Sequence, residues 1–269
     1  MNSINDRHGD VSGSAKRAAA TAGDHPVVEW GARLGYGASG VLHLLLAYLT
    51  VQIALGGGGK EASQSGALET LAEEPLGQVL LWVIAVGFTL LALWQLTELV
   101  TRHEASDKAK AGGKLVLYSA LAWTSFTFAM GGRTSSNKQS KDFTRTLMDA
   151  PAGEVLVGLV GVAIIGIGGY HVYKGWREKF LEDLQEHPGR WVVIVAKIGY
   201  IGKGIALGAV GVLFITAAIQ QRAGKATGLD GALRSMRDLP AGTVILLGIA
   251  LGLLAYGVYS FARARYARV

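Results

Sequence analysis

The sequence predicts an all-α integral membrane protein with six transmembrane helices. They form three tandem parallel two-helix repeats in a pseudo-threefold bundle. Half of the 269 residues are hydrophobic and only 17% are charged, and the mean hydropathy is +0.33. The apolar residues gather in six stretches, each close to the ~20 residues that cross a hydrocarbon core of ~30 Å. Short motifs also recur three times along the chain, which indicates internal repeats.

Short charged segments separate the six apolar stretches. The predicted spans are approximately Ala32–Leu55, Leu76–Val100, Leu115–Met130, Ala152–Lys174, Ile194–Ile219 and Ala241–Arg263. The third is the shortest and most polar, with hydroxyl side chains at Ser119, Thr124, Ser125 and Thr127. Residues 1–30 lack the apolar core of a signal peptide, so we expect a disordered cytoplasmic tail followed by an uncleaved signal anchor. The repeats then occupy residues 31–104, 112–184 and 191–269.

The repeats are visible at the start of the odd-numbered and even-numbered spans. A tyrosine recurs every 82 residues at the start of the odd spans, as Tyr36, Tyr118 and Tyr200. The even spans start with Pro-x-Gly, as Pro75 and Gly77, Pro151 and Gly153, and Pro240 and Gly242. Proline is tolerated in the first turn of a helix, where its missing N–H has no intrahelical partner. Nineteen residues after each proline comes an aromatic residue, Trp94, Tyr170 or Tyr259, about one hydrocarbon thickness further along a helix.

The distribution of Lys and Arg predicts the orientation. Sixteen basic residues lie in the tail, the second and fourth loops and the C-terminal segment, against nine in the first, third and fifth loops. The positive-inside rule therefore places both termini in the cytoplasm. Since two spans return the chain to its starting side, successive repeats insert with the same topology, around an axis along the membrane normal.

Three motifs resemble those of a known family. They are Ala-[Arg/Lys]-x-Gly-Tyr at the odd spans, Pro-x-Gly at the even spans, and the segment 169–180, GYHVYKGWREKF. Over roughly residues 30 to 265, the chain resembles the bacterial membrane family catalogued as domain of unknown function 1206, whose members carry three such repeats. The resemblance implies an architecture in the bacterial cell membrane and no established chemistry. The second repeat departs most from the pattern, because it lacks the glycine before Tyr118.

Several function classes are excluded or disfavoured. The chain has no cysteine, which rules out disulfides, thiolate metal sites and a cysteine nucleophile. It also lacks a nucleophile elbow, a zinc-ligand cluster, paired carboxylates and a dinucleotide fingerprint. The net charge of +6 is spread in short groups between apolar runs, which disfavours a nucleic-acid patch. We therefore expect a protein that is not an enzyme and that has no cofactor.

Three polar residues within or next to the spans are candidates for ligand or ion contact: His43, Lys203 and Glu98. Lys203 lies one turn after Tyr200 and is either functional or snorkels to the interface. His43 lies near mid-membrane, and it either relays protons or is a neutral histidine bonded across helices. Glu98 ends the second span and is expected to pair with a basic neighbour. A haem pair of His43 and His171 is not expected, because the two lie at different depths.

The repeated aromatics also have two interpretations. Tyr36, Tyr118 and Tyr200, with Trp94, Tyr170 and Tyr259, form either an aromatic-lined mouth or a belt at headgroup level. The small residues Gly204 and Gly208 predict close helix packing, as do Gly248 and Gly252.

Two functions follow from this pattern. The first is a structural or accessory membrane protein, with lipids and a membrane-protein complex or homo-oligomer as partners. The second is a transporter or channel for a small solute or ion, with a path along the pseudo-threefold axis. The segments before the prolines place apolar residues three or four apart, which predicts three short interfacial helices that form a lid on the extracytoplasmic side.

Overall fold

The computed structural model describes residues 26–57, 59–101 and 104–267, and regular structure within these ranges is helical. The α-helices are Pro26–Ala54 (α2), Gln64–Ala72 (α3), Gly77–Thr101 (α4), Ala105–Ala129 (α5), Ser136–Met148 (α6), Gly153–Trp176 (α7), Arg190–Ile219 (α8), Gly228–Arg237 (α9) and Gly242–Tyr266 (α10). Two 3₁₀ helices, Lys179–Asp183 (η1) and Ala223–Lys225 (η2), lie in the connections. The all-α prediction is confirmed.

The predicted disordered tail falls largely on residues 1–25, which lie outside the described residues. Its last part, residues 26–30, belongs to α2 instead, because the helix begins at Pro26. Proline is favoured at a first helical position, where its ring fixes a helical φ angle.

Five helices are long and apolar enough to cross a membrane: residues 30–54 of α2, and α4, α7, α8 and α10. The predicted third span lies in α5, which is as long as α4, with 25 residues. The first half of α5 carries Asp107, Lys108, Lys110 and Lys114, so only its second half is apolar. That half corresponds to about 22 Å of helix, which is short of a full hydrocarbon core.

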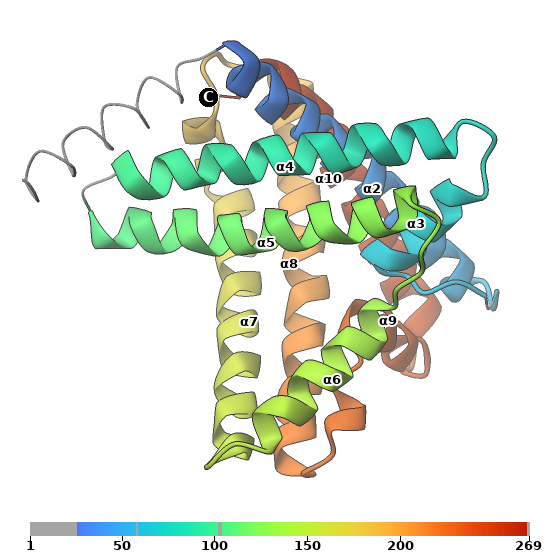
Figure 1. Ribbon diagram of the computed structural model, residues 1–269. Helices are drawn as coiled ribbons and strands as arrows, with labels where there is room; N and C mark the ends of the chain where they lie inside the picture. Colours follow the sequence, from blue (N-terminus) through green and yellow to red (C-terminus); the bar gives the residue numbers. More distant parts are fainter. Residues whose placement is uncertain (1–25, 58, 102–103, 268–269) are drawn as a thin grey trace, which may run out of the picture.

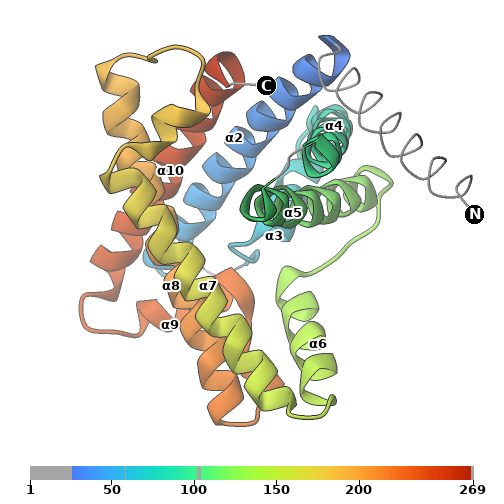
Figure 2. The same cartoon turned by 90° about the vertical axis from the view of Figure 1, so that its left-hand side faces the viewer.

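The long helices form three consecutive units, each with a short helix between two long ones: α2–α3–α4, α5–α6–α7 and α8–α9–α10. Long helices from neighbouring units pack side by side, α4 with α5, α7 with α8, and α10 with α2 (Figures 1 and 2). The last pair joins the third unit back to the first. In each pair, the second long helix of one unit therefore packs against the first long helix of the next unit.

Small residues make these pairs close. A Cβ atom on Gly40 of α2 would lie 3.1 Å from the Gly257 oxygen of α10. A Cβ atom on Gly204 of α8 would lie 2.5 Å from the Gly168 oxygen of α7. Gly40 and Gly204 occupy the same position after the repeated tyrosine, and Gly168 and Gly257 the same position after the repeated proline. The α4–α5 pair has Ala92 and Ala122 at these positions, so all three pairs keep small residues where the helices approach.

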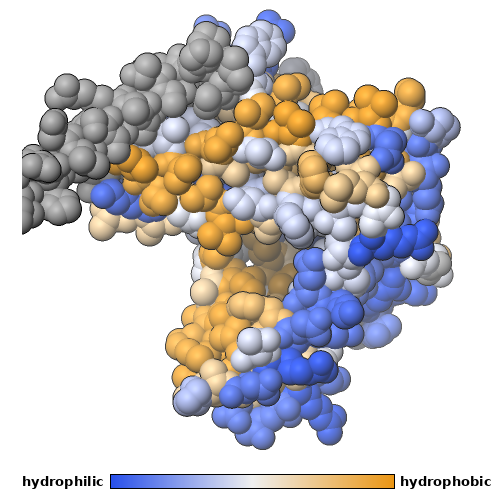
Figure 3. Space-filling view, in the orientation of Figure 1, coloured by the Kyte–Doolittle hydropathy of each residue, from blue (hydrophilic) through white to orange (hydrophobic). Residues whose placement is uncertain are grey.

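Within a unit, the two long helices pack against each other in the first and third units only. A Cβ atom on Gly35 of α2 would lie 2.2 Å from Leu91 Cδ1 of α4. Its counterpart Gly199 of α8 would meet the Tyr256 backbone of α10 at 2.6 Å. In the second unit, α5 passes α7 at a steep angle and does not pack along it (Figures 1 and 2). The surface is hollowed between α5 and α6 at this place, with hydrophobic side chains inside (Figure 3).

The three short helices lie together where α2, α5 and α8 end and α4, α7 and α10 begin (Figure 1), and Tyr36 and Tyr200 lie toward the other ends of α2 and α8. We refer to the first place as the short-helix end, and to the second as the tyrosine end. The prediction that the three segments before the prolines are helical is confirmed. They are not equally exposed, because Leu68 and Leu71 of α3 are buried, whereas Thr144 is the buried residue of α6.

The Pro-x-Gly motif makes the turn from each short helix into the returning long helix. The long helix begins at the glycine, so the proline lies in the turn and not within the first helical turn as predicted. A Cβ atom on Gly77 would lie 1.5 Å from the Leu71 oxygen. Those on Gly153 and Gly242 would lie 2.3 and 2.2 Å from carbonyl oxygens of the preceding helices. Glycine is therefore required where the chain folds back on the short helix.

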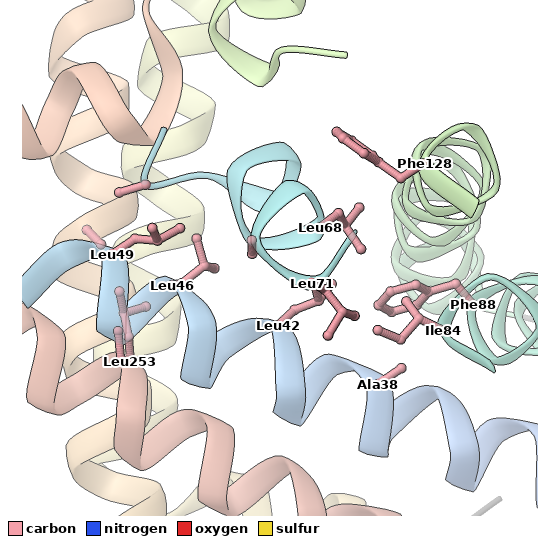
Figure 4. Close-up of a cluster of buried hydrophobic side chains, with 14 of the residues drawn as sticks. Ala38, Leu42, Leu46, Leu49, Leu68, Leu71, Ile84, Phe88, Phe128 and Leu253 are labelled. Atoms are coloured by element: carbon pink, nitrogen blue, oxygen red, sulfur yellow. The ribbon is translucent and has the colours of Figure 1, made fainter. Parts of the chain in front are cut away.

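The main apolar core lies between α2, α3, α4, α5 and α10 (Figure 4). Its centre includes Leu42, Leu46, Leu68, Phe88 and Leu253, each at most 2% exposed. Leu68 of α3 enters this core from the short-helix end. The space between α2 and α4 at the short-helix end is therefore filled by apolar side chains.

Candidate functional site

At the tyrosine end, aromatic side chains from three elements form a compact cluster. Tyr200 of α8 lies 5.5 Å from Phe180 of η1, 5.3 Å from Tyr256 and 5.5 Å from Tyr259 of α10, between ring centroids. Tyr200 and Tyr259 are 3% and 0% exposed. Edge and offset contacts at these distances are favourable beyond the area they bury, so the cluster fixes the tyrosine ends of α8 and α10 to η1.

Three basic side chains lie over the rings of this cluster and its neighbour in α2. The Lys203 Nζ is 4.0 Å from the Tyr256 centroid, and the Lys174 Nζ is 5.7 Å from that of Tyr200. The Arg263 guanidinium carbon is 4.4 Å from the centroid of Tyr36. These distances fit cation–π contacts, which are strongest when the cation is shielded from water.

Asp183 of η1 partly balances this charge. Its carboxylate accepts from the Lys174 Nζ at 2.6 Å and lies 3.6 Å from an Arg263 nitrogen. The side chains of Lys174 and Arg263 are only 15% and 14% exposed. Two buried polar atoms, the Tyr259 hydroxyl and Arg263 Nε, have no hydrogen-bond partner within the described residues. The site therefore combines several cations with one close carboxylate.

The two histidines flank the tyrosine cluster from either side. The His43 ring is 4.6 Å from that of Tyr256, and the His171 ring is 5.8 Å from that of Tyr200. His43 Nδ1 is 2.7 Å from the Ser39 carbonyl oxygen, and His171 Nδ1 is 2.9 Å from that of Ile167. A carbonyl only accepts, so each Nδ1 carries the proton when these bonds form, and Nε2 is left as the acceptor.

A second polar network joins the three units at the short-helix end. The buried carboxylate of Asp230, at the start of α9, accepts from the Ala62 N–H at 2.9 Å and from Asn137 Nδ2 at 2.9 Å. Arg234 Nε donates to the same carboxylate at 2.9 Å. Glu61 accepts from the Ser135 hydroxyl next to α6. Each unit thus contributes at least one residue to this network.

Comparison with known proteins gives the chain a family. The sequence profile of the Domain of Unknown Function (DUF1206) family matches three times, over residues 34–102, 109–178 and 198–267. The chain belongs to this family. It is 28% identical over 248 residues to the uncharacterized protein YxxB of Bacillus subtilis, covering 87% of this chain and 89% of that protein. No solved structure matches.

The three DUF1206 matches coincide with the three structural units. Arg263, in the third match, lies over the ring of Tyr36 in the first, with 4.4 Å between the guanidinium carbon and the ring centroid. The ring of Tyr118 instead stacks with that of Phe88 in α4, with 6.1 Å between the ring centroids. Arg263 therefore joins the third DUF1206 repeat to the repeated tyrosine of the first.

The remaining predicted residues divide into those near the site and those away from it. Glu98 is partly buried, while Trp94 packs at the edge of the main core. Tyr170 is 51% exposed and lies outside the cluster. Gly204 meets α7, but a Cβ atom on Gly208 would find open space within 4 Å. The structure thus brings His43, Lys203 and three of the six predicted aromatics, Tyr36, Tyr200 and Tyr259, to one end.

Sequence reasoning missed the residues that unite the short helices, chiefly Asp230 and its partner Asn137. The only local signal was the spacing of Asp230 and Arg234 on one helix face, which is common on exposed helices. It also missed Asp183, which lies in η1 three residues after the end of the motif at 169–180. Among the described residues, no group of three His, Asp or Glu side chains is placed to hold a metal ion.

Proposed function

We propose that this protein is a non-enzymatic accessory protein of the bacterial cell membrane, in which the second repeat holds a transmembrane helix of a partner protein. The observation that carries the proposal is that, within the described part of the chain, α5 and α7 do not pack along each other. Of the most apolar stretch of α7, only 17% is buried, against 44% for α4 and 56% for α10. The three helices are equivalent in the repeats, so α7 lacks a neighbour that its counterparts have.

The faces that α5 and α7 turn toward each other are apolar and exposed. Leu117 of α5 and Ile167 of α7 occupy the places of Gly35 and Leu91 in the first repeat, and both are 52% exposed. The large side chain of Leu117 prevents the close approach that a glycine allows. We call the space between these faces the seam. Because Leu117 keeps α5 away from α7, a helix from another protein fits the seam better than α5 does.

Small residues on α7 favour a helix as that occupant. Ala163, Gly166 and Gly169 are exposed, and Cβ atoms on the two glycines would meet nothing within 4 Å. Transmembrane helices associate through such small-residue faces, where backbones approach closely. A partner helix in the seam would restore to α7 the kind of contact that α4 makes with α2.

The same proposal includes six spans in a pseudo-threefold arrangement, with both termini in the cytoplasm. The cyclic pairing of α4 with α5, α7 with α8 and α10 with α2 supports the threefold relation. In this arrangement α5 is the sixth span, with its apolar half in the membrane and Lys114 snorkelling toward the cytoplasmic headgroups. The tyrosine end is then cytoplasmic, in agreement with the excess of basic residues there.

The alternative of a transport path along the axis has weaker support. His43 and Lys203 do share the tyrosine end, as such a path requires. Further along α2, however, the inward-facing residues are Leu46, Leu49 and Ile53, each 2% exposed, and Thr50, whose hydroxyl donates to the Leu46 carbonyl of the same helix. The three apolar residues belong to the apolar core that Leu68 of α3 completes (Figure 4). Conducting paths need several polar residues at successive depths.

The test is purification of the full chain in mild detergent, followed by native mass spectrometry. We expect a complex with a partner membrane protein in fixed ratio. Gly166→Leu fills the seam and should abolish the complex. Gly248→Leu is the matched control, because Gly248 is also an exposed glycine of a returning helix with nothing within 4 Å of its Cβ position. A monomeric preparation, or a complex that survives Gly166→Leu, contradicts the proposal.

A further inference from the structure

A groove separate from the seam lies between α2, α4 and the C-terminal end of α10. It has a volume of about 500 Å³. Its walls are apolar, formed chiefly by Leu34, Val41, Leu80, Val83 and Phe261. Four of these five side chains are also 41–48% exposed at the outer surface, so the groove opens sideways, toward the lipid that surrounds the molecule.

The tyrosine end of this groove is basic. Arg33 of α2 and Arg265 of α10 line it there, next to the exposed ring of Trp30. Arg33 Nη1 donates to the Arg265 carbonyl oxygen at 2.8 Å, which brings two residues 232 positions apart in the chain to one place. A guanidinium has five N–H donors in a planar fork, and this geometry suits phosphate.

Along the groove, the distance from the arginines to the apolar end fits a lipid chain. Arg33 and Val41 are separated by eight residues, or ~12 Å of helix. Half of a hydrocarbon core is ~15 Å. Between them Gly37 has no side chain, and a Cβ atom there would meet nothing within 4 Å. The groove is therefore continuous from the basic end to the apolar end.

The third repeat carries the same groove in a modified form. Ile198, Gly202, Ile205 and Ile249 occupy the places of Leu34, Ala38, Val41 and Ile84. Here Ile201 replaces Gly37 and lines two separate cavities, of about 530 and 400 Å³, instead of one groove. Lys197 replaces Arg33 and pairs with Glu178 at 2.9 Å.

In the groove of the third repeat, Trp176 of α7 lies at the position that Arg265 of α10 has in the first-repeat groove. The charge of that groove is therefore balanced within the protein. The first-repeat groove is lined at its basic end by two arginines, Arg33 and Arg265.

We propose that the groove of the first repeat binds an anionic phospholipid. The phosphate lies against Arg33 and Arg265, and one acyl chain passes over Gly37 between α2 and α4. Basic sites between transmembrane helices recognise anionic headgroups in this way. In the third-repeat groove, Lys197 already pairs with Glu178 and Ile201 interrupts the floor, so we expect no such preference there.

The experiment measures binding of phosphatidylglycerol and phosphatidylcholine, with identical acyl chains, to the delipidated full-length protein by native mass spectrometry. The wild type should bind phosphatidylglycerol more tightly. Arg265→Gln should reduce that preference about fivefold, the effect of one basic residue near a membrane surface. Gly37→Leu should weaken both lipids, because it fills the floor of the groove. Since the Gly37 Cβ position is open, this variant should keep the thermal stability of the lipid-free wild type.

Matched controls separate this site from general surface lipid. Lys197→Gln in the third repeat should leave the preference unchanged, and so should Gly248→Leu. The seam variant Gly166→Leu should also keep it, so the failure of one proposal is distinguishable from the failure of the other. Equal binding of the two lipids by the wild type would overturn the inference, and so would a preference that Arg265→Gln does not alter.

Discussion

The first and second repeats have the same order of helices but differ in whether the unit is closed. In the first repeat, Gly35 lets the backbone of α2 approach Leu91 of α4. In the second, Leu117 stands at the place of Gly35, and both it and its expected partner Ile167 are half exposed. The contacts with neighbouring repeats are kept in both, because Gly40 and Gly257, or Ala92 and Ala122, remain small.

The comparison indicates that the helix contacts within a repeat and those between repeats depend on different small residues. Without a hydrophobic driving force between helices in lipid, close packing depends on small residues at the contact. Loss of one glycine opens the interface in which it lies and leaves the others intact. The second repeat is therefore still attached through α4–α5, α7–α8 and the short-helix network.

The largest expected effect comes from placing the second repeat's leucine in the first. Gly35→Leu would put its Cβ 2.2 Å from Leu91 Cδ1 and 2.7 Å from the Gly87 oxygen. Such overpacking should destabilise the fold by about 3 kcal/mol. Thermal unfolding in detergent, followed by size-exclusion chromatography, measures it. Gly37→Leu, two residues on and facing open space, is the control. An unchanged melting temperature for Gly35→Leu would show that this glycine does not hold the unit closed.

The next effect concerns the network that ties the open repeat to the others. Asp230→Ala would leave Arg234 and Asn137 without their common acceptor. Loss of a hydrogen bond to a charged group costs about 1.5–3 kcal/mol. We expect lower thermal stability and faster proteolysis in the loop before α6, which Asn137 helps to hold. Asp238→Ala, at the exposed end of α9, should change neither measurement, and equal proteolysis of both variants would contradict the role of Asp230.

A smaller effect is expected at the tyrosine end, where the third repeat alone has a lysine. Lys203→Met keeps the length of the side chain but removes the cation 4.0 Å above Tyr256. The loss should be about 1–2 kcal/mol, the range for a shielded cation–π contact. Ser39→Met, at the equivalent place of the first repeat, serves as the comparison in the same melting assay. If Lys203→Met is no less stable than Ser39→Met, the cation contributes nothing to this end.

The smallest effect on stability, and the sharpest on geometry, is expected from Leu117→Gly. It gives the second repeat the small residue of the other two, so α5 should move toward α7, to the ~8–10 Å spacing of packed helices. Since the chain has no cysteine, spin labels on Val116→Cys and Val162→Cys would report the distance by electron resonance. The same label pair on the otherwise unchanged protein is the reference. Identical distance distributions in both would show that Leu117 does not keep the seam open.

The sequence was informative where one residue type satisfies a local demand. The Pro-x-Gly motif located the start of α4, α7 and α10, because only glycine fits against the preceding carbonyl at Gly77 and its counterparts. The three short helices were predicted from the spacing of residues such as Leu68 and Leu71, and all three form. The start of α5 was not predicted, because the hydropathy of the sequence marked only its apolar second half, whereas the charged first half belongs to the same helix.

Apolar stretches and recurring motifs are local properties of the chain, so they were enough to predict the helical class, the three repeats and the missing glycine before Tyr118 in the second repeat. The pairing of the long helices, the position of Arg263 over Tyr36 and the bond between Asp230 and Asn137 follow from the tertiary structure alone. It also placed Arg33 and Arg265 at the end of one groove. These contacts join residues far apart in the chain, and their distances depend on the packing of whole helices, which periodicity does not encode.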